Sequence, residues 1–144
     1  MCKGSLFVLL GVLAIFVVGC GLTRSQPGPS ETLAPSLTTI ADIERDPEAF
    51  RDQAVRIQGY GIIEATVPLC PGYVGMDRRT QFVDAAQKMI AAQLQDEALK
   101  GQRRYDPQNL RVFEGYIRIF SGEIGCPGAT QVETFPYFEI TGVQ

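Results

Sequence analysis

The clearest pattern in the chain is a strict alternation between residues 55 and 65. Every second position is apolar or small, in a row made of Val55, Ile57, Gly59, Gly61, Ile63 and Ala65. A period of two over this length predicts a half-buried β-strand. The glycines inside the row let the strand bend sharply, as strands of small barrels do at their corners.

A second long strand is predicted over residues 110–124, with Gly115 at a bend or bulge. A third is predicted over residues 135–143. Pro136 lacks an N–H group, so it belongs at the start of that strand or on a sheet edge. Between these strands, residues 129–133 are expected to form a polar turn.

The segment from residue 80 to residue 100 fits two structures. Its apolar residues recur at helical spacing and its composition favours a helix. The stretches 81–83 and 89–91 also fit the two arms of a β-hairpin that turns near Ala86 and Gln87. We predict the hairpin, followed by a short helical turn at 96–100, and keep a helix over 82–100 as the alternative.

The residues before the first long strand carry two helix-start signals. Thr39 is a predicted N-cap with Asp42 three residues later. Asp46 precedes Pro47 in the same way, since proline is tolerated at the first helical position. One or two short helical turns are therefore expected, with Ile40, Ile43 and Phe50 buried.

Together these elements predict a mainly β fold, a small five-stranded barrel with a short N-terminal helix. The stretch from Thr39 to Gly59 resembles the entry into the first strand of OB-fold domains in exported bacterial proteins, which implies an OB-like barrel. The alternative is an α+β domain, an antiparallel sheet with the helix at 82–100.

The N-terminal stretch has the layout of a secretory signal peptide. Lys3 is followed by an apolar run from Leu6 to Val18 and by Gly19 and Cys20. The run is shorter than the roughly 20 apolar residues of a membrane-spanning helix. A cleaved segment is therefore predicted, although an uncleaved anchor helix over 4–21 would just reach the lower limit.

The residues Val17-Val18-Gly19-Cys20 resemble the lipobox of bacterial lipoprotein precursors. This resemblance implies that Cys20 is S-acylated with diacylglycerol, which brings fatty acids such as palmitate, and becomes the new N-terminus. The mature protein is then expected on the extracytoplasmic side of the cell membrane.

Three segments are therefore predicted. Residues 1–19 form the signal peptide, residues 20–37 a flexible Pro/Ser/Gly-rich tether, and residues 38–144 a single β-rich domain. The tether is too polar to offset its ordering entropy by burial.

The composition argues against nucleic-acid binding and against enzymatic activity. Removal of Lys3 leaves 12 basic and 16 acidic residues, a formal charge of −4, whereas a nucleic-acid-binding protein needs a basic surface. The chain has no histidine, the commonest general base and nitrogen ligand, and no recognisable catalytic motif. We therefore expect no nucleic-acid partner, no enzymatic activity, no metal and no cofactor.

Two cysteines remain in the mature domain, Cys70 and Cys126, each at the start of a Cys-Pro-Gly tripeptide. In an exported protein an even pair predicts a disulfide bond. The alternative is an envelope enzyme or thiol redox protein that uses these two residues. Redox centres usually place their thiols close together in sequence, so the structural disulfide is the better prediction.

A candidate binding face consists of aromatic and arginine residues on the outward sides of the two long strands: Arg56, Tyr60, Tyr116, Arg118 and Phe120. Aromatic rings beside guanidinium groups bind oligonucleotides or sugars on OB-type faces. The alternative is that these side chains only cover the barrel or pack under the Cys70 loop. The predicted function is a lipid-anchored binding or scaffold module of the cell envelope, held at the membrane by its anchor, with an envelope protein, a glycan or a lipid as its partner.

Overall fold

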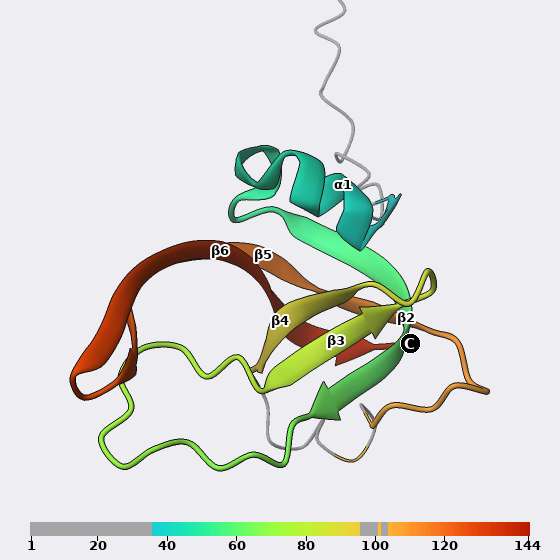
Figure 1. The fold of residues 1–144 in the computed structure, drawn as a ribbon. Helices are drawn as coiled ribbons and strands as arrows, with labels where there is room; N and C mark the ends of the chain where they lie inside the picture. The colour runs from blue at the N-terminus through green and yellow to red at the C-terminus, as the bar shows by residue number, and fades with distance from the viewer. Residues whose placement is uncertain (1–35, 96–100, 102–103) are drawn as a thin grey trace, which may run out of the picture. The chain divides into compact units, whose positions relative to one another are not determined.

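The computed structural model describes residues 36–95, residue 101 and residues 104–144 (Figure 1). The predicted signal peptide, Cys20, nearly all of the tether and the predicted turn at 96–100 lie outside these residues. Within these residues the elements are, in chain order, β1 (Leu37–Thr38), α1 (Ile40–Arg45), the 3-10 turn η1 (Pro47–Phe50), β2 (Ala54–Glu64), β3 (Thr80–Asp84), β4 (Met89–Leu94), β5 (Arg111–Cys126) and β6 (Ala129–Val143).

Five strands pair into a closed ring. β2 is antiparallel to both β3 and β5, β3 is antiparallel to β4, β4 is parallel to β6, and β6 is antiparallel to β5. β1 adds a short parallel pairing to β2, in which Leu37, assigned above to the tether, lies opposite Arg56. The prediction of a mainly β domain with five main strands and a short N-terminal helix is confirmed.

The ambiguous segment is a hairpin. β3 and β4 form over residues 80–94 and pair antiparallel, with Gln81 opposite Ala91 and Val83 opposite Met89. The alternative of a helix over 82–100 is therefore wrong. Phe82, Val83, Ile90 and Ala92 are buried in this hairpin. Burial against the other strands of the ring overrides the helical propensity of the segment.

The prediction of a polar turn at residues 129–133 is wrong, because these residues are the first part of β6. The turn is shorter: Cys126 pairs with Ala129, so only Pro127 and Gly128 connect β5 to β6. Here the hairpin extends beyond the ring and both of its faces can carry polar side chains. We call this extension, residues 119–136, the arm.

The helix start signals are confirmed. The Thr39 hydroxyl accepts a hydrogen bond from the Asp42 N–H (3.2 Å) and donates to the Asp42 carboxylate (2.6 Å). The Asp46 side chain accepts from the Ala49 N–H at the start of η1. These caps hold α1 so that Ile40 and Ile43 are fully buried. The expectation for Phe50 is wrong in part, because Phe50 packs against the core from η1 but is only partly buried.

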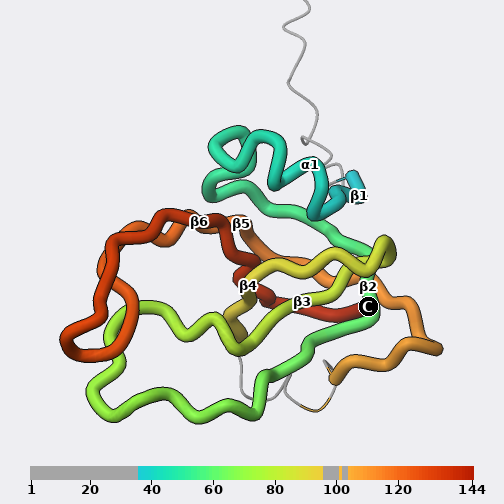
Figure 2. Tube along the Cα trace, viewed as in Figure 1, coloured from blue at the N-terminus to red at the C-terminus, as the bar shows by residue number. Residues whose placement is uncertain are grey.

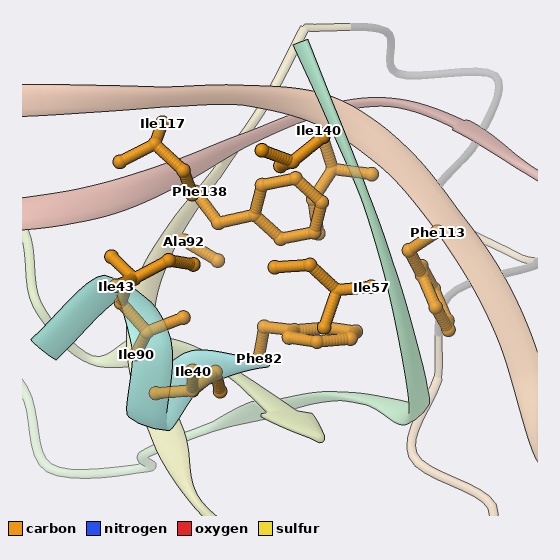
Figure 3. Packing of buried hydrophobic residues seen from close by; sticks show 11 residues of the cluster. Ile40, Ile43, Ile57, Phe82, Ile90, Ala92, Phe113, Ile117, Phe138 and Ile140 are labelled. Carbon is orange, nitrogen blue, oxygen red and sulfur yellow. The ribbon is translucent and has the colours of Figure 1, made fainter. Parts of the chain in front are cut away.

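The core fills the ring and is closed at one end by α1 (Figure 3). Three phenylalanines from three strands meet edge to face, with Phe82 4.8 Å from Phe113 and 5.3 Å from Phe138 between ring centroids. Asp84, 2% exposed, accepts hydrogen bonds from the Ile40 N–H at the start of α1 and from the turn between β3 and β4. This carboxylate ties the helix to the ring.

Glycines allow the strands to bend. The pairing of β2 with β3 shifts register between Gly59 and Gly61, and Gly61 has a φ of 118°. A Cβ atom on Gly115, at the bulge of β5, would clash with the Glu139 carbonyl oxygen. Only glycine permits this close approach of β5 to β6.

Candidate functional site

The outward side of the β5–β6 hairpin carries a row of aromatic and charged residues. Tyr116, Arg118 and Phe120 alternate along β5, as the sequence predicts, and cross-strand pairing adds three neighbours from β6 on the same side. We call this row the outer face; it consists of Tyr116, Arg118, Phe120, Phe135, Tyr137 and Glu139.

Arg118 lies at the centre of the outer face. Its Nη1 atom is 2.7 Å from Asp52 Oδ1 and its Nε atom 2.7 Å from Glu139 Oε2. The other Glu139 oxygen accepts from Gln95 at 2.9 Å. The guanidinium lies 4.9 Å from the centroid of the Tyr116 ring, at cation–π distance.

These contacts shift the pKa values of three groups, Arg118, Glu139 and Tyr137. The hydrogen bonds from Arg118 to Asp52 and Glu139 raise the arginine pKa above its ordinary value. Burial favours the neutral form of Glu139, but its hydrogen bonds to Arg118 and Gln95, with the arginine charge, lower its pKa overall. Burial, followed by the Glu139 charge, raises the pKa of Tyr137. Arg118 and Glu139 are therefore both charged at neutral pH, and the Tyr137 hydroxyl stays protonated.

Phe120 belongs to the arm rather than to the exposed centre of the face. Its ring stacks on Phe135 at 5.1 Å and lies over Gly122. Arg78 from the loop between β2 and β3 covers Phe135 at 4.4 Å and pairs with Glu133 at 2.7 Å. Phe120 is thus packed close to the Cys70 loop, in line with the structural alternative for this residue.

Arg56 lies beside Tyr116, because Ala54 is opposite Tyr116 and Arg56 follows two residues later. Its Nε atom is 3.3 Å from Glu114 Oε1, and its Nη2 atom donates to Gln144 (3.1 Å). The structure therefore places Arg118 against Tyr116 and puts Arg56 diagonally across from Tyr116 on the neighbouring strand.

Tyr60 is separate from these residues. It lies beyond Gly59, the last residue of β2 that pairs with β5, and contacts Tyr105 edge to face at 6.3 Å. The five predicted residues therefore form a central group, an arm residue and a distant tyrosine.

A cavity of about 1040 Å³ opens at the end of β3 away from α1. Its lining comes from β2, β3, β4 and the segment after β4: Ile62, Ile63, Glu64, Thr80, Leu94, Gly101, Arg104 and Tyr105. Sequence patterns did not indicate this cavity, because four separate segments form it. Its lining residue Tyr105 contacts Tyr60 of the predicted face.

The disulfide pair connects the arm to the loop between β2 and β3. Cys70 and Cys126 are bonded through their sulfur atoms, and their Cα atoms are 6.0 Å apart. Val74 and Gly125 exchange two backbone hydrogen bonds nearby. Figure 2 shows this loop passing the tip of the arm. The bond between the two cysteines therefore holds the loop against the tip of the arm.

Within the described residues, no group of three histidine, cysteine or acidic side chains is placed to hold a metal ion. No helix in the same part of the chain is both long and apolar enough to cross a membrane.

Comparison with known proteins gives no assignment: no family model, curated protein or solved structure matches this chain.

Proposed function

We propose that this protein is a lipid-anchored binding module of the cell envelope, and that it holds its partner at the centre of the outer face. The carrying observation is the exposed Tyr116 ring, which is fixed against Arg118 by an ion-paired cluster on two long strands. Tyr116 is 37% exposed although it is aromatic. Rigid aromatic and arginine side chains are the groups that dominate binding energy at interfaces.

The charges around Tyr116 favour some partners over others. Arg56 and Arg118 face three carboxylates, those of Asp52, Glu114 and Glu139, so the local formal charge is −1. Both guanidinium groups are already engaged by carboxylates. An anionic headgroup or a nucleic acid would meet net repulsion here, whereas an envelope protein or a glycan with hydroxyl groups fits better.

The lipobox and the polar tether support the location of the module. A lipid on Cys20 would hold the chain at the membrane, and the segment between Cys20 and β1 would let the domain stand about 20–24 Å from the anchor. Intact-mass analysis of the membrane fraction is expected to show cleavage before Cys20 and a diacylglyceryl adduct. A mature protein that retains residues 1–19 would contradict the anchor.

The binding face is tested with Tyr116→Ser in the anchored protein. The expected result is loss of a crosslinked partner from the envelope with a nearly unchanged melting temperature, because the ring is partly exposed and its loss leaves the ion pairs in place. Met89→Ser is the matched control, since Met89 is 51% exposed on β4. If the Tyr116→Ser variant captures the same partners as the wild type, this face does not bind them.

A further inference from the structure

The arm has one edge whose backbone groups are available for another strand. Gly125 exchanges its two hydrogen bonds with Val74, on the side of β5 away from β6. Its cross-strand neighbour Thr130 therefore directs its own N–H and C=O away from β5, as the residues of a non-hydrogen-bonded pair do. By the period of two, Val132 and Thr134 point their backbone groups the same way.

No described residue pairs with this edge of the arm. β4 pairs with β6 only from Tyr137 onward, and within residues 36–95, 101 and 104–144 no backbone hydrogen bond outside the β5–β6 ladder reaches 129–136. Figure 1 shows this part of β6 running out from the ring to the tip of the hairpin. Unpaired strand edges are templates for another strand.

The side chains on this edge do not protect it. Proteins commonly protect open edges with lysine, proline or bulges, but the three outward positions are Thr130, Val132 and Thr134. Val132 is 74% exposed, the most exposed of the large apolar residues that the structure describes. Pro136, the next position of the same parity, has no N–H and limits the edge on one side.

The edge matches itself around Val132. If two copies pair antiparallel with Val132 opposite Val132, each Thr130 lies opposite a Thr134 and each Gln131 opposite a Glu133. Pro136 then lies opposite Gly128 of the turn, where no ladder bond is needed. No like charges face each other directly, and both exposed valines become covered.

We infer that the edge of β6 over residues 129–135 is an interface for a second copy of this chain, joined by antiparallel strand pairing across a two-fold axis at Val132. The three outward residues of each copy supply six ladder hydrogen bonds in the dimer. The contact is small, so the dimer is expected to be weak and to form at high local concentration.

The two edge variants act in different ways. Val132→Pro removes only an N–H that points away from β5, so the β5–β6 ladder is kept, as it is at Pro136. Val132→Lys places two ammonium groups opposite each other across the axis. Val67→Lys is the matched control, because Val67 is 70% exposed and lies in the loop between β2 and β3.

The test measures the mass of the full chain in detergent, by light scattering over a wide concentration range, together with amide hydrogen exchange. The expected result is a monomer that dimerises as concentration rises, with concentration-dependent protection of the Thr130, Val132 and Thr134 amides. Both Val132 variants should raise the dissociation constant at least about tenfold, and Val67→Lys should leave it unchanged.

Three outcomes would overturn the inference. A wild-type chain that stays monomeric at every concentration excludes the dimer. A dimer that persists in both Val132 variants uses another surface. Protection of the three amides in a monomer that carries a strand from a different protein shows that the edge pairs with another partner. Because Tyr116 plays no part in this edge, the Tyr116→Ser result is independent of all three outcomes.

Discussion

At the residue scale, Arg118 determines how the outer face is built. Asp52 reaches it from a turn, where Asp52 has a φ of 57° and its N–H donates to the Ile117 carbonyl at 2.7 Å. Aspartate tolerates this left-handed conformation better than most residues. Since Glu139 projects from a strand, both carboxylates are positioned by the backbone and the guanidinium is held between them.

The lowered pKa of Glu139 predicts a specific pH dependence of stability. A carboxyl group whose pKa is lower in the folded state stabilises the fold above its ordinary value of 4.5 and loses that contribution as the pH falls further. Glu139→Gln should therefore be less stable than the wild type at neutral pH. The difference should shrink as the pH falls below about 4.5.

Urea unfolding of both proteins across this range measures the effect. Other ion pairs, such as Asp77 with Arg79, also lose stability as their carboxylates are protonated. That loss is the same in both proteins and cancels in the difference between them. A difference in the free energy of unfolding that stays constant with pH would show that the Glu139→Gln change disturbs packing only.

Interactions between residues close together in the sequence could be predicted, whereas those between distant residues could not. Thr39 and Asp46 could be identified as caps because their partners lie three residues away. The partners of Arg118 could not, since Asp52 is 66 residues away and Glu139 is 21 residues away. A Tyr-x-Glu sequence at residues 137–139 becomes meaningful only when the register of β6 against β5 is known.

At the element scale, the alternation of apolar and polar residues predicted some strands, whereas others depend on burial against the rest of the ring. Strict alternation predicted β2 with nearly its observed bounds. It did not separate a helix from a hairpin over residues 80–94, because both patterns place Phe82 and Ile90 in the core. In the arm, alternation of apolar and polar residues is weak since neither face is part of the ring's core, and residues 129–133 were therefore assigned to a turn.

Asp84 connects two elements, and its removal should loosen both. Its Oδ1 atom accepts from the Ala86 and Lys88 N–H groups at 2.9 and 2.8 Å, and its Oδ2 atom accepts from Ile40 at 3.3 Å. Asp84→Ala leaves the N–H of the fully buried Ile40 without its acceptor, which costs about 1–3 kcal/mol, and it also removes the two bonds from the more exposed turn. Asp84→Asn can keep the two turn bonds and lose only the one to α1.

Thermal unfolding is therefore expected to rank the wild type above Asp84→Asn and Asp84→Ala lowest. In the Asp84→Asn variant, faster hydrogen exchange should be concentrated in α1. If both variants unfold at the wild-type temperature, Asp84 is not the link between α1 and the ring.

At the scale of the whole domain, distant pairings close the structure. β2 must meet β5, and β4 must run parallel to β6, before the ring is complete. The number of strands and their glycine bends indicated a small closed fold, but the sequence patterns did not predict the parallel pairing. They also did not predict the arm, which lies beyond the ring and is joined to the loop between β2 and β3 by Cys70 and Cys126.

The disulfide should contribute to global stability and also to the order of the arm. Replacing both cysteines by serine removes a cross-link between residues 56 positions apart, which on the chain-entropy model costs about 4 kcal/mol of unfolding free energy. The same change frees the loop locally. The amides of Val74 and Gly125, which bond to each other, should then exchange much faster than those of the ring.

Urea unfolding and residue-resolved hydrogen exchange of Cys70→Ser/Cys126→Ser against the wild type separate these two effects. The buried Met76 and Ile124 still favour docking of the loop, so the variant is expected to keep the ring and open at the arm first. Equal loss of protection at Val74 and at Ile57, within the ring, would show that the disulfide acts only on the unfolded chain. Unequal loss would show that the arm is a separately opening unit, whose order depends on the bond between its tip and the loop.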